Sequence, residues 1–435
     1  MALQRILVLF NILLFGSSLR LVESLIDGGK IVVGNNETDR RLALLEFKKQ
    51  IINDPYGTLS SWNNSIHFCN WVGIVCSNLQ QQRVISLDLQ GKGLGGNISP
   101  SIGNLTFLQH LNMGENSIHG RIPQEMGNLI SIQLISFENN TLEGELPSSL
   151  ANCTSLTQIY FNNNNLVRKI SGEPFTSLSK LEVITISGNG LTGEIPAFFG
   201  NLSSLQDLSL DGNALQGTIP KSLGQLSNLY ILAIGRNNLS GMVPLSLYNL
   251  SSLQMFNLQQ NQLHGSLPRD IGLTLPNLKV LILGQNLFSG TIPNSIANIS
   301  TLELFYLDQN SFVGPVPNNF ENLQNLQTFD IDGNQCGTGE ANDLDFVNSL
   351  LNCTNLNVLS LQINGFKGPL PNVKANLSTQ LSVLYLGRNQ IYGTIPSVIE
   401  NLVNLTGLGI EENFLEGNIP FVIGKLPKLQ RLYLL

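Results

Sequence analysis

The chain of 435 residues has few charged side chains, and this shortage limits the kinds of molecule that it could bind. Only 12% of the residues are Asp, Glu, Lys or Arg, the net charge is −7, and no basic run occurs. Nucleic-acid binding needs a basic stripe, so the composition argues against a nucleic-acid partner. Long apolar runs are also missing after the N-terminus. Because a membrane-spanning helix needs about 18 or more apolar residues, none is expected in the mature chain.

The sequence also lacks the patterns that catalysis or metal binding would require. Its four histidines have no spacing with cysteines or acids that is typical of a metal site. Residues 91–96 fit G-x-G-x-x-G, but no helix-forming stretch follows to aim N–H groups at a phosphate. Residues 330–334 begin like a calcium loop, yet Gln335 and Ala341 stand where glycine and a bidentate glutamate are needed. With no kinase catalytic motif either, we expect no enzyme, cofactor or metal within these residues.

A pattern of leucines repeats along most of the chain. Residues 205–220 read LQDLSLDGNALQGTIP, and residues 229–244 read LYILAIGRNNLSGMVP, 24 residues later. This spacing at this period is the signature of a leucine-rich repeat solenoid, whose units bury their apolar sides only against one another. We therefore expect a right-handed α/β leucine-rich repeat solenoid with about 14 repeats of 24 residues and a truncated last one.

The residue types within one repeat have structural reasons. Leu208 and Leu210 alternate with polar residues, so this segment is expected to be a strand with one buried face. The amide of Asn213 can satisfy backbone groups of the turn and of the neighbouring repeat. Gly217 is expected to make a sharp bend, and Pro220 to keep the chain extended. The outward residues of successive strands then form rows on one shared parallel sheet.

The repeat asparagine recurs as a ladder, mostly in steps of 24 residues. Between Asn334 and Asn364 the step is 30, which indicates a six-residue insertion. After Asn164 the G-x-I-P is replaced by VRKISGEPF, and the first repeat has Lys92 in place of asparagine, as terminal repeats often differ. The predicted ladder consists of Asn116, Asn140, Asn164, Asn189, Asn213, Asn237, Asn261, Asn286, Asn310, Asn334, Asn364, Asn389 and Asn413.

The N-terminal segments predict secretion and a cap for the solenoid. A basic residue, an apolar stretch and small residues are arranged as in a secretory signal. A helix capped by Thr38 or Asp39 and running to about Ile52 should follow, with two tryptophans completing the cap. Because the last repeat is incomplete, we expect the chain to be a fragment of something longer. The predicted domains are a signal peptide at residues 1–24, the N-terminal cap at residues 25–82 and the repeats at residues 83–435.

The five cysteines fall into two groups. Cys69 and Cys76 lie close together before the first repeat and are expected to pair in an oxidising compartment. Cys153 and Cys353 share a repeat position but lie too far apart to bridge. Cys336 occupies a buried leucine position, so it is expected to be a free thiol, with a Cys336–Cys353 bridge as the alternative.

Sequons for N-glycosylation are frequent, and many recur at one repeat position, in the N-L-[ST] of the outer segment. This position would leave room for glycans, although Asn and Ser are also common turn residues. The predicted glycosylation sites are Asn36, Asn63, Asn97, Asn104, Asn139, Asn152, Asn201, Asn238, Asn249, Asn298, Asn352, Asn376 and Asn404.

The cap and repeats together resemble the ectodomains of plant leucine-rich repeat receptor-like serine/threonine kinases. The cap pattern C-x-W-x-G-[IV]-x-C is present as Cys69, Trp71, Gly73 and Cys76, and most repeats carry the plant-type L-x-G-x-[IL]-P. Finer features, such as NDLDFVNSLLNCTNL at residues 342–356, resemble the branch that contains the receptor for a bacterial elongation factor peptide and the rice blight-resistance receptor.

This resemblance implies an ectodomain that binds a microbial or endogenous peptide in immune signalling, on the extracellular side of the plasma membrane. In that family a membrane helix and a cytosolic kinase follow, and a co-receptor kinase with a shorter repeat ectodomain is a further expected partner. A secreted inhibitor of a microbial cell-wall-degrading enzyme and a kinase-less receptor-like protein are the alternatives. The gene sequence that follows residue 435 would separate them.

The candidate ligand surface is the concave strand face. Asp308 and Asp332 share a repeat position, so stacking would place them about 5 Å apart. Carboxylates that close repel unless a cation neutralises them, and we hypothesise a docking patch for a basic peptide. A solvated acidic face would explain the same residues. The predicted binding residues are Glu303, Tyr306, Asp308, Asp330, Asp332, Tyr230, Arg236 and Tyr385, with the tyrosines as exposed aromatic anchors.

Overall fold

The computed structural model describes residues 37–434 except 79–81, 173, 176 and 371–379. The chain divides into two units at residue 36, and the described residues all belong to the second. The predicted signal peptide and the sequons at Asn36 and Asn376 lie outside the described residues.

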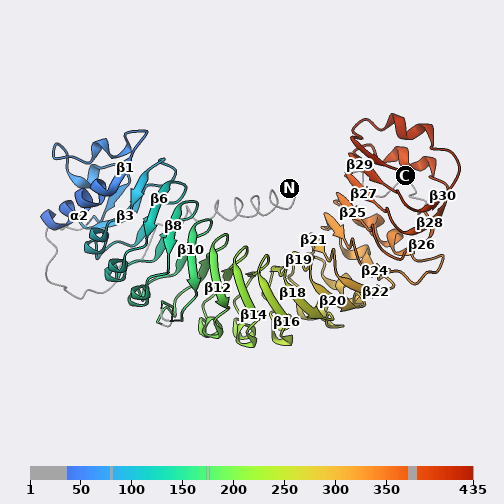
Figure 1. Ribbon diagram of the computed structural model, residues 1–435, viewed down its shortest axis with the longest axis horizontal. Coiled ribbons are helices and arrows are strands. Elements are labelled where there is room, and N and C mark those ends of the chain that lie inside the picture. The colour runs from blue at the N-terminus through green and yellow to red at the C-terminus, as the bar shows by residue number, and fades with distance from the viewer. Residues whose placement is uncertain (1–36, 79–81, 173, 176, 371–379, 435) are drawn as a thin grey trace. The chain divides into compact units, whose positions relative to one another are not determined.

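One long sheet runs through all the repeats, and Figure 1 shows its strands stacked in chain order. From β3 onward every neighbouring pair is parallel and in register, because each repeat contributes the same short L-x-L segment. Only β2, from the cap, joins antiparallel. The strands are β2 (Ile74–Cys76), β3 (Val84–Asp88), β5 (His110–Asn112), β7 (Leu134–Ser136), β9 (Gln158–Tyr160), β11 (Val183–Thr185), β13 (Asp207–Ser209), β15 (Ile231–Ala233), β17 (Met255–Asn257), β19 (Val280–Ile282), β21 (Leu304–Tyr306), β23 (Thr328–Asp330), β25 (Val358–Ser360), β27 (Val383–Tyr385), β29 (Gly407–Gly409) and β31 (Arg431–Tyr433).

A second sheet is built from the L-x-G-x-[IL]-P segments, where glycines such as Gly217 (φ +80°) make the expected bend. It contains β1 (Ile51–Asn53), β4 (Gly95–Asn97), β6 (Ser117–Arg121), β8 (Thr141–Gly144), β10 (Asn165–Lys169), β12 (Gly190–Glu194), β14 (Ala214–Thr218), β16 (Asn238–Met242), β18 (Gln262–Gly265), β20 (Leu287–Gly290), β22 (Ser311–Gly314) and β24 (Gln335–Cys336). A third, shorter sheet contains β26 (Lys367–Pro369), β28 (Gln390–Gly393) and β30 (Phe414–Leu415).

The predicted six-residue insertion lies where the second sheet ends and the third begins. The loop is held by Asp343, whose carboxylate accepts hydrogen bonds from the backbone N–H groups of Thr338 (2.8 Å), Gly339 (2.9 Å) and Lys367 (3.1 Å). The insertion is therefore an ordered part of the repeat that follows Asn334.

The outer segments are mostly single 3-10 turns rather than α-helices, since a repeat of 24 residues leaves room for one turn only. Most follow the proline of the preceding motif, and α3 (Ile271–Thr274) forms where the repeat is one residue longer. The 3-10 turns are Thr58–Ser61, Phe68–Asn70, Pro100–Asn104, Gln124–Asn128, Ser148–Asn152, Ala197–Asn201, Lys221–Gln225, Leu245–Asn249, Asn294–Asn298, Phe320–Asn322, Asp345–Asn352, Ser397–Asn401 and Phe421–Lys425.

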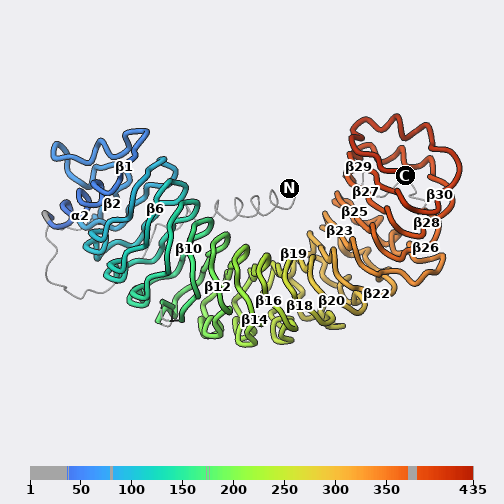
Figure 2. The backbone as a smooth tube through the Cα atoms, viewed as in Figure 1, coloured from blue at the N-terminus to red at the C-terminus, as the bar shows by residue number. Residues whose placement is uncertain are grey.

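The core is continuous between the sheets and the outer turns. Figure 2 lets the reader follow the backbone from one repeat to the next. Leu208, Leu210 and Leu215 are fully buried, as the repeat pattern predicts. The amide of Asn213 donates to the carbonyl oxygens of Ile186 and Leu210 (both 3.0 Å), in the neighbouring and its own repeat. The leucine-rich repeat solenoid is thus confirmed.

The N-terminal cap closes the first repeats with aromatic rings and a disulfide. Helix α2 (Glu37–Gln50) buries Leu44 and Phe47, and the rings of Trp62 and Trp71 stack with centroids 5.4 Å apart. The predicted Cys69–Cys76 disulfide is confirmed. The predicted extension of the helix to Ile52 is wrong, because β1 begins at residue 51 and pairs antiparallel with β4, which covers the sheet edge.

The remaining cysteines are free and buried. Cys336 and Cys353 are not bridged, so the alternative left open by the sequence is not realised. Burial raises the pKa of the Cys153, Cys336 and Cys353 thiols to about 12, which leaves them protonated and unreactive at neutral pH.

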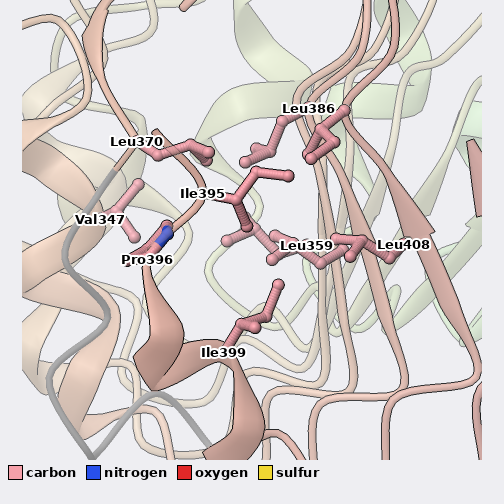
Figure 3. A pocket seen from close by; sticks show the side chains of 10 residues that line it. Val347, Leu359, Leu370, Leu386, Ile395, Pro396, Ile399 and Leu408 are labelled. Carbon is pink, nitrogen blue, oxygen red and sulfur yellow. The ribbon is translucent and has the colours of Figure 1, made fainter. Parts of the chain in front are cut away.

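A small cavity of about 20 Å³ lies inside the late repeats. Figure 3 shows the side chains that line it. Leu359, Leu386, Leu408 and Ile399 are among its lining residues, all of which are apolar. With no polar group to orient a ligand, we interpret it as a packing gap in the core. Among the described residues, no helix is both long and apolar enough to cross a membrane.

Candidate ligand-binding surface

The outward residues of the long sheet form a strand face on which each side chain occupies a fixed place. Neighbouring strands lie about 4.8 Å apart, and equivalent residues of successive repeats are direct partners. Tyr306, for example, lies between Ile282 on one side and Asp330 on the other, and Asp330 is followed by Ser360. We define the strand face as these outward side chains and ask what they present to a ligand.

Three predicted acids, Asp308, Asp330 and Asp332, are gathered at one place on the strand face, and we call them the acidic group. The Asp332 carboxylate accepts hydrogen bonds from the backbone N–H (3.0 Å) and the side-chain amide (2.7 Å) of Gln362 in the next repeat. The Asp330 carboxylate accepts from the backbone N–H of Asp332 at 3.1 Å. These bonds hold the acidic group on rigid strands.

The acidic group is partly buried, and this raises the pKa values of its carboxyls. Burial is the main reason that the pKa of Asp332 is raised to about 6; the charge of Asp308 acts in the same direction, and hydrogen bonds, including those from Gln362, oppose the shift. Burial also raises the pKa of Asp330, and the charges of Asp332 and Asp308 add to it. In the described part of the chain, the ion pairs involve other residues, so no protein cation offsets these charges.

The other predicted residues surround this group at different depths. Tyr306 was expected to be exposed, and this is wrong, since it exposes only 9% of its surface between neighbouring strands. Tyr230 and Tyr385 are half-buried, and the ring of Tyr385 meets that of Tyr433 at 6.3 Å. Glu303 lies at the border of the strand face, where its carboxylate accepts from the side-chain amide of Gln327 at 3.2 Å.

Arg236 is held in an ion pair with Asp211 of the preceding repeat. Its Nε donates to the Asp211 carboxylate at 2.9 Å, and its Nη2 contacts the same oxygen. Burial raises the pKa of Asp211, and the hydrogen bond and charge of Arg236 oppose that shift. Arg236 is therefore partly neutralised and lies several strands away from the acidic group.

Sequence reasoning missed an apolar area between Arg236 and the acidic group. On strands β15, β17, β19 and β21 most outward positions carry apolar side chains that each expose between 1% and 7% of their surface, and Asn257 and Tyr306 occupy the other two. The available signal was the set of uninterrupted apolar runs, such as VLIL at residues 280–283, where other repeats alternate with polar residues. We call these side chains the apolar floor: Ile231, Ala233, Met255, Val280, Ile282 and Leu304.

Metal chemistry finds no support in this geometry. Over residues 37–434, outside the gaps given above, no group of three or more His, Cys, Asp or Glu side chains is arranged to hold a metal ion. What the strand face offers is an array of contacts for an extended ligand.

Comparison with known families accounts for the fold. A family model described as the leucine rich repeat N-terminal domain matches residues 37–77. Models described as leucine rich repeats match residues 154–215, 203–263, 107–129, 277–299 and 380–402. The chain is a leucine-rich repeat protein. The matched models describe a ligand-binding fold, and the kinase domain is not present in these 435 residues.

Several relatives of this leucine-rich repeat protein are plant receptor kinases. It is 55% identical over 84 residues to the LRR receptor-like serine/threonine-protein kinase EFR of Arabidopsis thaliana, a match that covers 19% of this chain and 8% of that relative. It is 44% identical over 80 residues to the receptor kinase-like protein Xa21 of Oryza sativa subsp. japonica, covering 17% of this chain and 8% of that relative. The matches thus span less than a tenth of these relatives.

Among solved structures, the plant peptide hormone receptor RGFR1 in complex with RGF2 is similar with a TM-score of 0.70 and 31% identity. The match covers 80% of this leucine-rich repeat chain and 58% of that chain. The family resemblance inferred from the cap and repeat motifs is thereby confirmed at the level of plant receptor-kinase ectodomains.

Proposed function

We propose that this chain is the extracellular ligand-recognition part of a plant receptor kinase and that it binds a microbial or endogenous peptide in immune signalling. The peptide lies along the strand face. A membrane helix and kinase would belong to the longer protein, and a co-receptor kinase with a shorter repeat ectodomain is a further partner in this proposal. The relatives and the peptide-bound structural neighbour support it.

The observation that carries the proposal is the uncompensated acidic group. Asp308, Asp330 and Asp332 are held on rigid strands, partly removed from water and paired with no protein cation in the described residues. A Lys or Arg side chain of a ligand would supply the missing charge at low reorganisation cost, because the carboxylates are already in place.

The arrangement of sequons supports the strand face over the outer turns. At the last residue of the outer turn, a sequon occurs in every second repeat, and each such asparagine is exposed. Glycans on this row would cover one edge of the solenoid and leave the strand face open. The row consists of Asn104, Asn152, Asn201, Asn249, Asn298 and Asn352.

Mass spectrometry of glycopeptides from the secreted protein checks this arrangement. We expect high occupancy along the row, because each asparagine ends an exposed turn. Asn97 should be occupied less, since it lies half-buried in β4 and its side-chain oxygen contacts the Gly120 backbone region. An unoccupied row would remove this support for the strand face.

A glycan placed on the strand face tests the proposal directly. Val358→Asn creates an Asn-Leu-Ser sequon on β25, beside the acidic group, whereas Gln324→Thr creates an Asn-Leu-Thr sequon on the exposed outer turn. The probe is a phage-displayed library of random peptides, enriched on the unmodified secreted chain. We expect enriched clones to bind at least about tenfold more weakly to the Val358→Asn protein, because a glycan at this position would keep the peptide from contacting the strand face.

The Gln324→Thr protein is the matched control, since it also gains one glycan, and its binding should not change. Clones that bind all three proteins equally would show that recognition takes place away from the strand face. The alternatives, a secreted inhibitor or a kinase-less receptor-like protein, share the same fold and would be separated by the full-length gene.

A further inference from the structure

The apolar floor has a defined position within the strand face. Ile231, Met255, Val280 and Leu304 are direct register partners across β15, β17, β19 and β21. Ala233 and Ile282 add a second row beside them, with Asn257 between the two. The floor thus runs across four neighbouring strands.

These side chains do not belong to the core of the solenoid. They alternate along their strands with Leu232, Phe256, Leu281 and Phe305, which are fully buried members of the continuous core, whereas the floor residues are not part of it. Successive side chains of a strand point to opposite faces, so the floor faces the ligand side. Each of its side chains exposes between 1% and 7% of its surface.

The floor offers a ligand no hydrogen bonds. The backbone groups of β15 to β21 are paired with the strands on either side, and the amide of Asn257 is bonded to Asp211 (3.4 Å) and Gln259 (3.1 Å). A polar ligand group pressed against this surface would lose its water without gaining a hydrogen-bond partner, which disfavours its binding. Apolar groups lose nothing there, so the surface selects them.

The two ends of the floor differ in the number of their carboxylates. At the Leu304 end lies the whole acidic group, since Asp308 follows β21 in the same repeat and Asp330 on β23 is the register partner of Tyr306. At the other end, Asp207 on β13 is the register partner of Ile231, and Asp211 is paired with Arg236. A ligand therefore meets an apolar surface with three gathered carboxylates at one end and, among the described residues, a single carboxylate without an ion pair at the other.

We infer that the ligand segment is an extended peptide that crosses β15 to β21 with aliphatic side chains on the apolar floor and places a Lys or Arg over the acidic group. This deepens the proposed function and rests on it. Four strands span about 14 Å, which an extended peptide covers with about four residues, at about 3.3 Å per residue. The basic residue then lies within about three residues of one end of the aliphatic stretch, since the acidic group begins just after β21 and continues onto the next strand.

The test uses the same phage-displayed random library and then a synthetic peptide of the enriched consensus. The expected consensus has an aliphatic stretch of about four residues with Lys or Arg within about three residues of one of its ends. Met255→Gln should weaken binding of the synthetic peptide at least fivefold. Val280→Thr, which keeps the shape and replaces one methyl group of the floor with a hydroxyl, should also weaken binding and covers the case in which Met255→Gln misfolds.

Val383→Thr is the matched control, because Val383 occupies the equivalent position on β27, outside the floor. The Val383→Thr protein should bind the synthetic peptide as tightly as the unmodified chain does. Asp332→Asn should weaken the consensus peptide at least tenfold, and a peptide with Gln in place of its basic residue should lose this sensitivity.

The possible outcomes distinguish a failure of this inference from a failure of the proposed function. Clones that are blocked by the Val358→Asn glycan but share no aliphatic-basic pattern would overturn this inference and leave strand-face recognition standing. Clones that carry the pattern but are insensitive to both floor variants would also overturn it. Clones that ignore the Val358→Asn glycan would overturn the proposed function itself.

Discussion

Replacing Asn140 with alanine is expected to lower the free energy of unfolding by at least about 3 kcal/mol, because several buried backbone groups lose their partner at once. The amide of Asn140 donates to the carbonyl oxygens of Met113 (2.9 Å), Phe137 (3.1 Å) and Glu138 (3.2 Å). Its oxygen accepts from the backbone N–H of Ile118 at 2.9 Å. Water cannot replace these bonds freely, since Asn140 exposes only 8% of its surface.

The measurement is urea unfolding of the secreted chain, with hydrogen exchange to locate the change. Faster exchange should appear at Ile118 and in the strands next to Asn140, since a repeat contacts mainly its neighbours. Asn325→Ala is the control, because Asn325 is exposed and makes one bond, to the carbonyl oxygen of Ser300 at 3.1 Å. Equal effects of the two substitutions would show that the asparagine ladder is not a main source of stability.

The ladder could be predicted from sequence because its chemistry has few solutions. A short polar side chain that recurs at the end of each strand must serve the backbone of a turn, and an amide both donates and accepts. The same reasoning located the sheet, the bends at glycines such as Gly217 and the insertion after Asn334. Each depends on local chemistry or on the repeat period, both of which are visible in one chain.

The candidate site was less predictable, because the repeat pattern constrains only its inward residues. Tyr306 was expected to be exposed, although it exposes only 9% of its surface, and Val280, which exposes only 1%, was not singled out at all. The apolar floor depends on the coincidence of aliphatic residues in four adjacent repeats. The end of the N-terminal helix was missed similarly, since Ile51 leaves the helix to pair with Gly96 in a distant segment.

Asp207 is another strand-face residue that proves to be buried, and its burial has a larger energetic consequence. By its position it was expected to be an outward polar residue, yet it exposes only 8% of its surface on β13. Burial raises the pKa of its carboxyl to about 7, and the hydrogen bond from the Ser209 hydroxyl (2.6 Å) opposes the shift. The ionised form is therefore the unfavourable one in the folded state.

Asp207→Asn is expected to stabilise the folded chain at pH 8 and to have little effect at pH 4. In the unfolded chain the carboxyl ionises near its ordinary pKa of 3.8, and in the folded chain near 7. Between these values the folded state binds the additional proton, so the contribution of Asp207 to stability falls as the pH rises. Above pH 7 the full penalty is present, on the order of 4 kcal/mol at about 1.4 kcal/mol per pKa unit.

An amide in place of the carboxylate removes this charge while its oxygen can still accept the Ser209 hydrogen bond. Unfolding of the variant and the unmodified chain should be compared at pH 4, 6 and 8, with Asp88→Asn as the control because Asp88 is an exposed strand-face carboxylate. The control should change stability little at any of these pH values. A gain for Asp207→Asn that is the same at pH 4 and pH 8 would mean that the buried charge is not its cause. A loss at pH 8 would mean that the ionised carboxylate stabilises the strand face, and the low solvation inferred for the acids of this face would then be wrong.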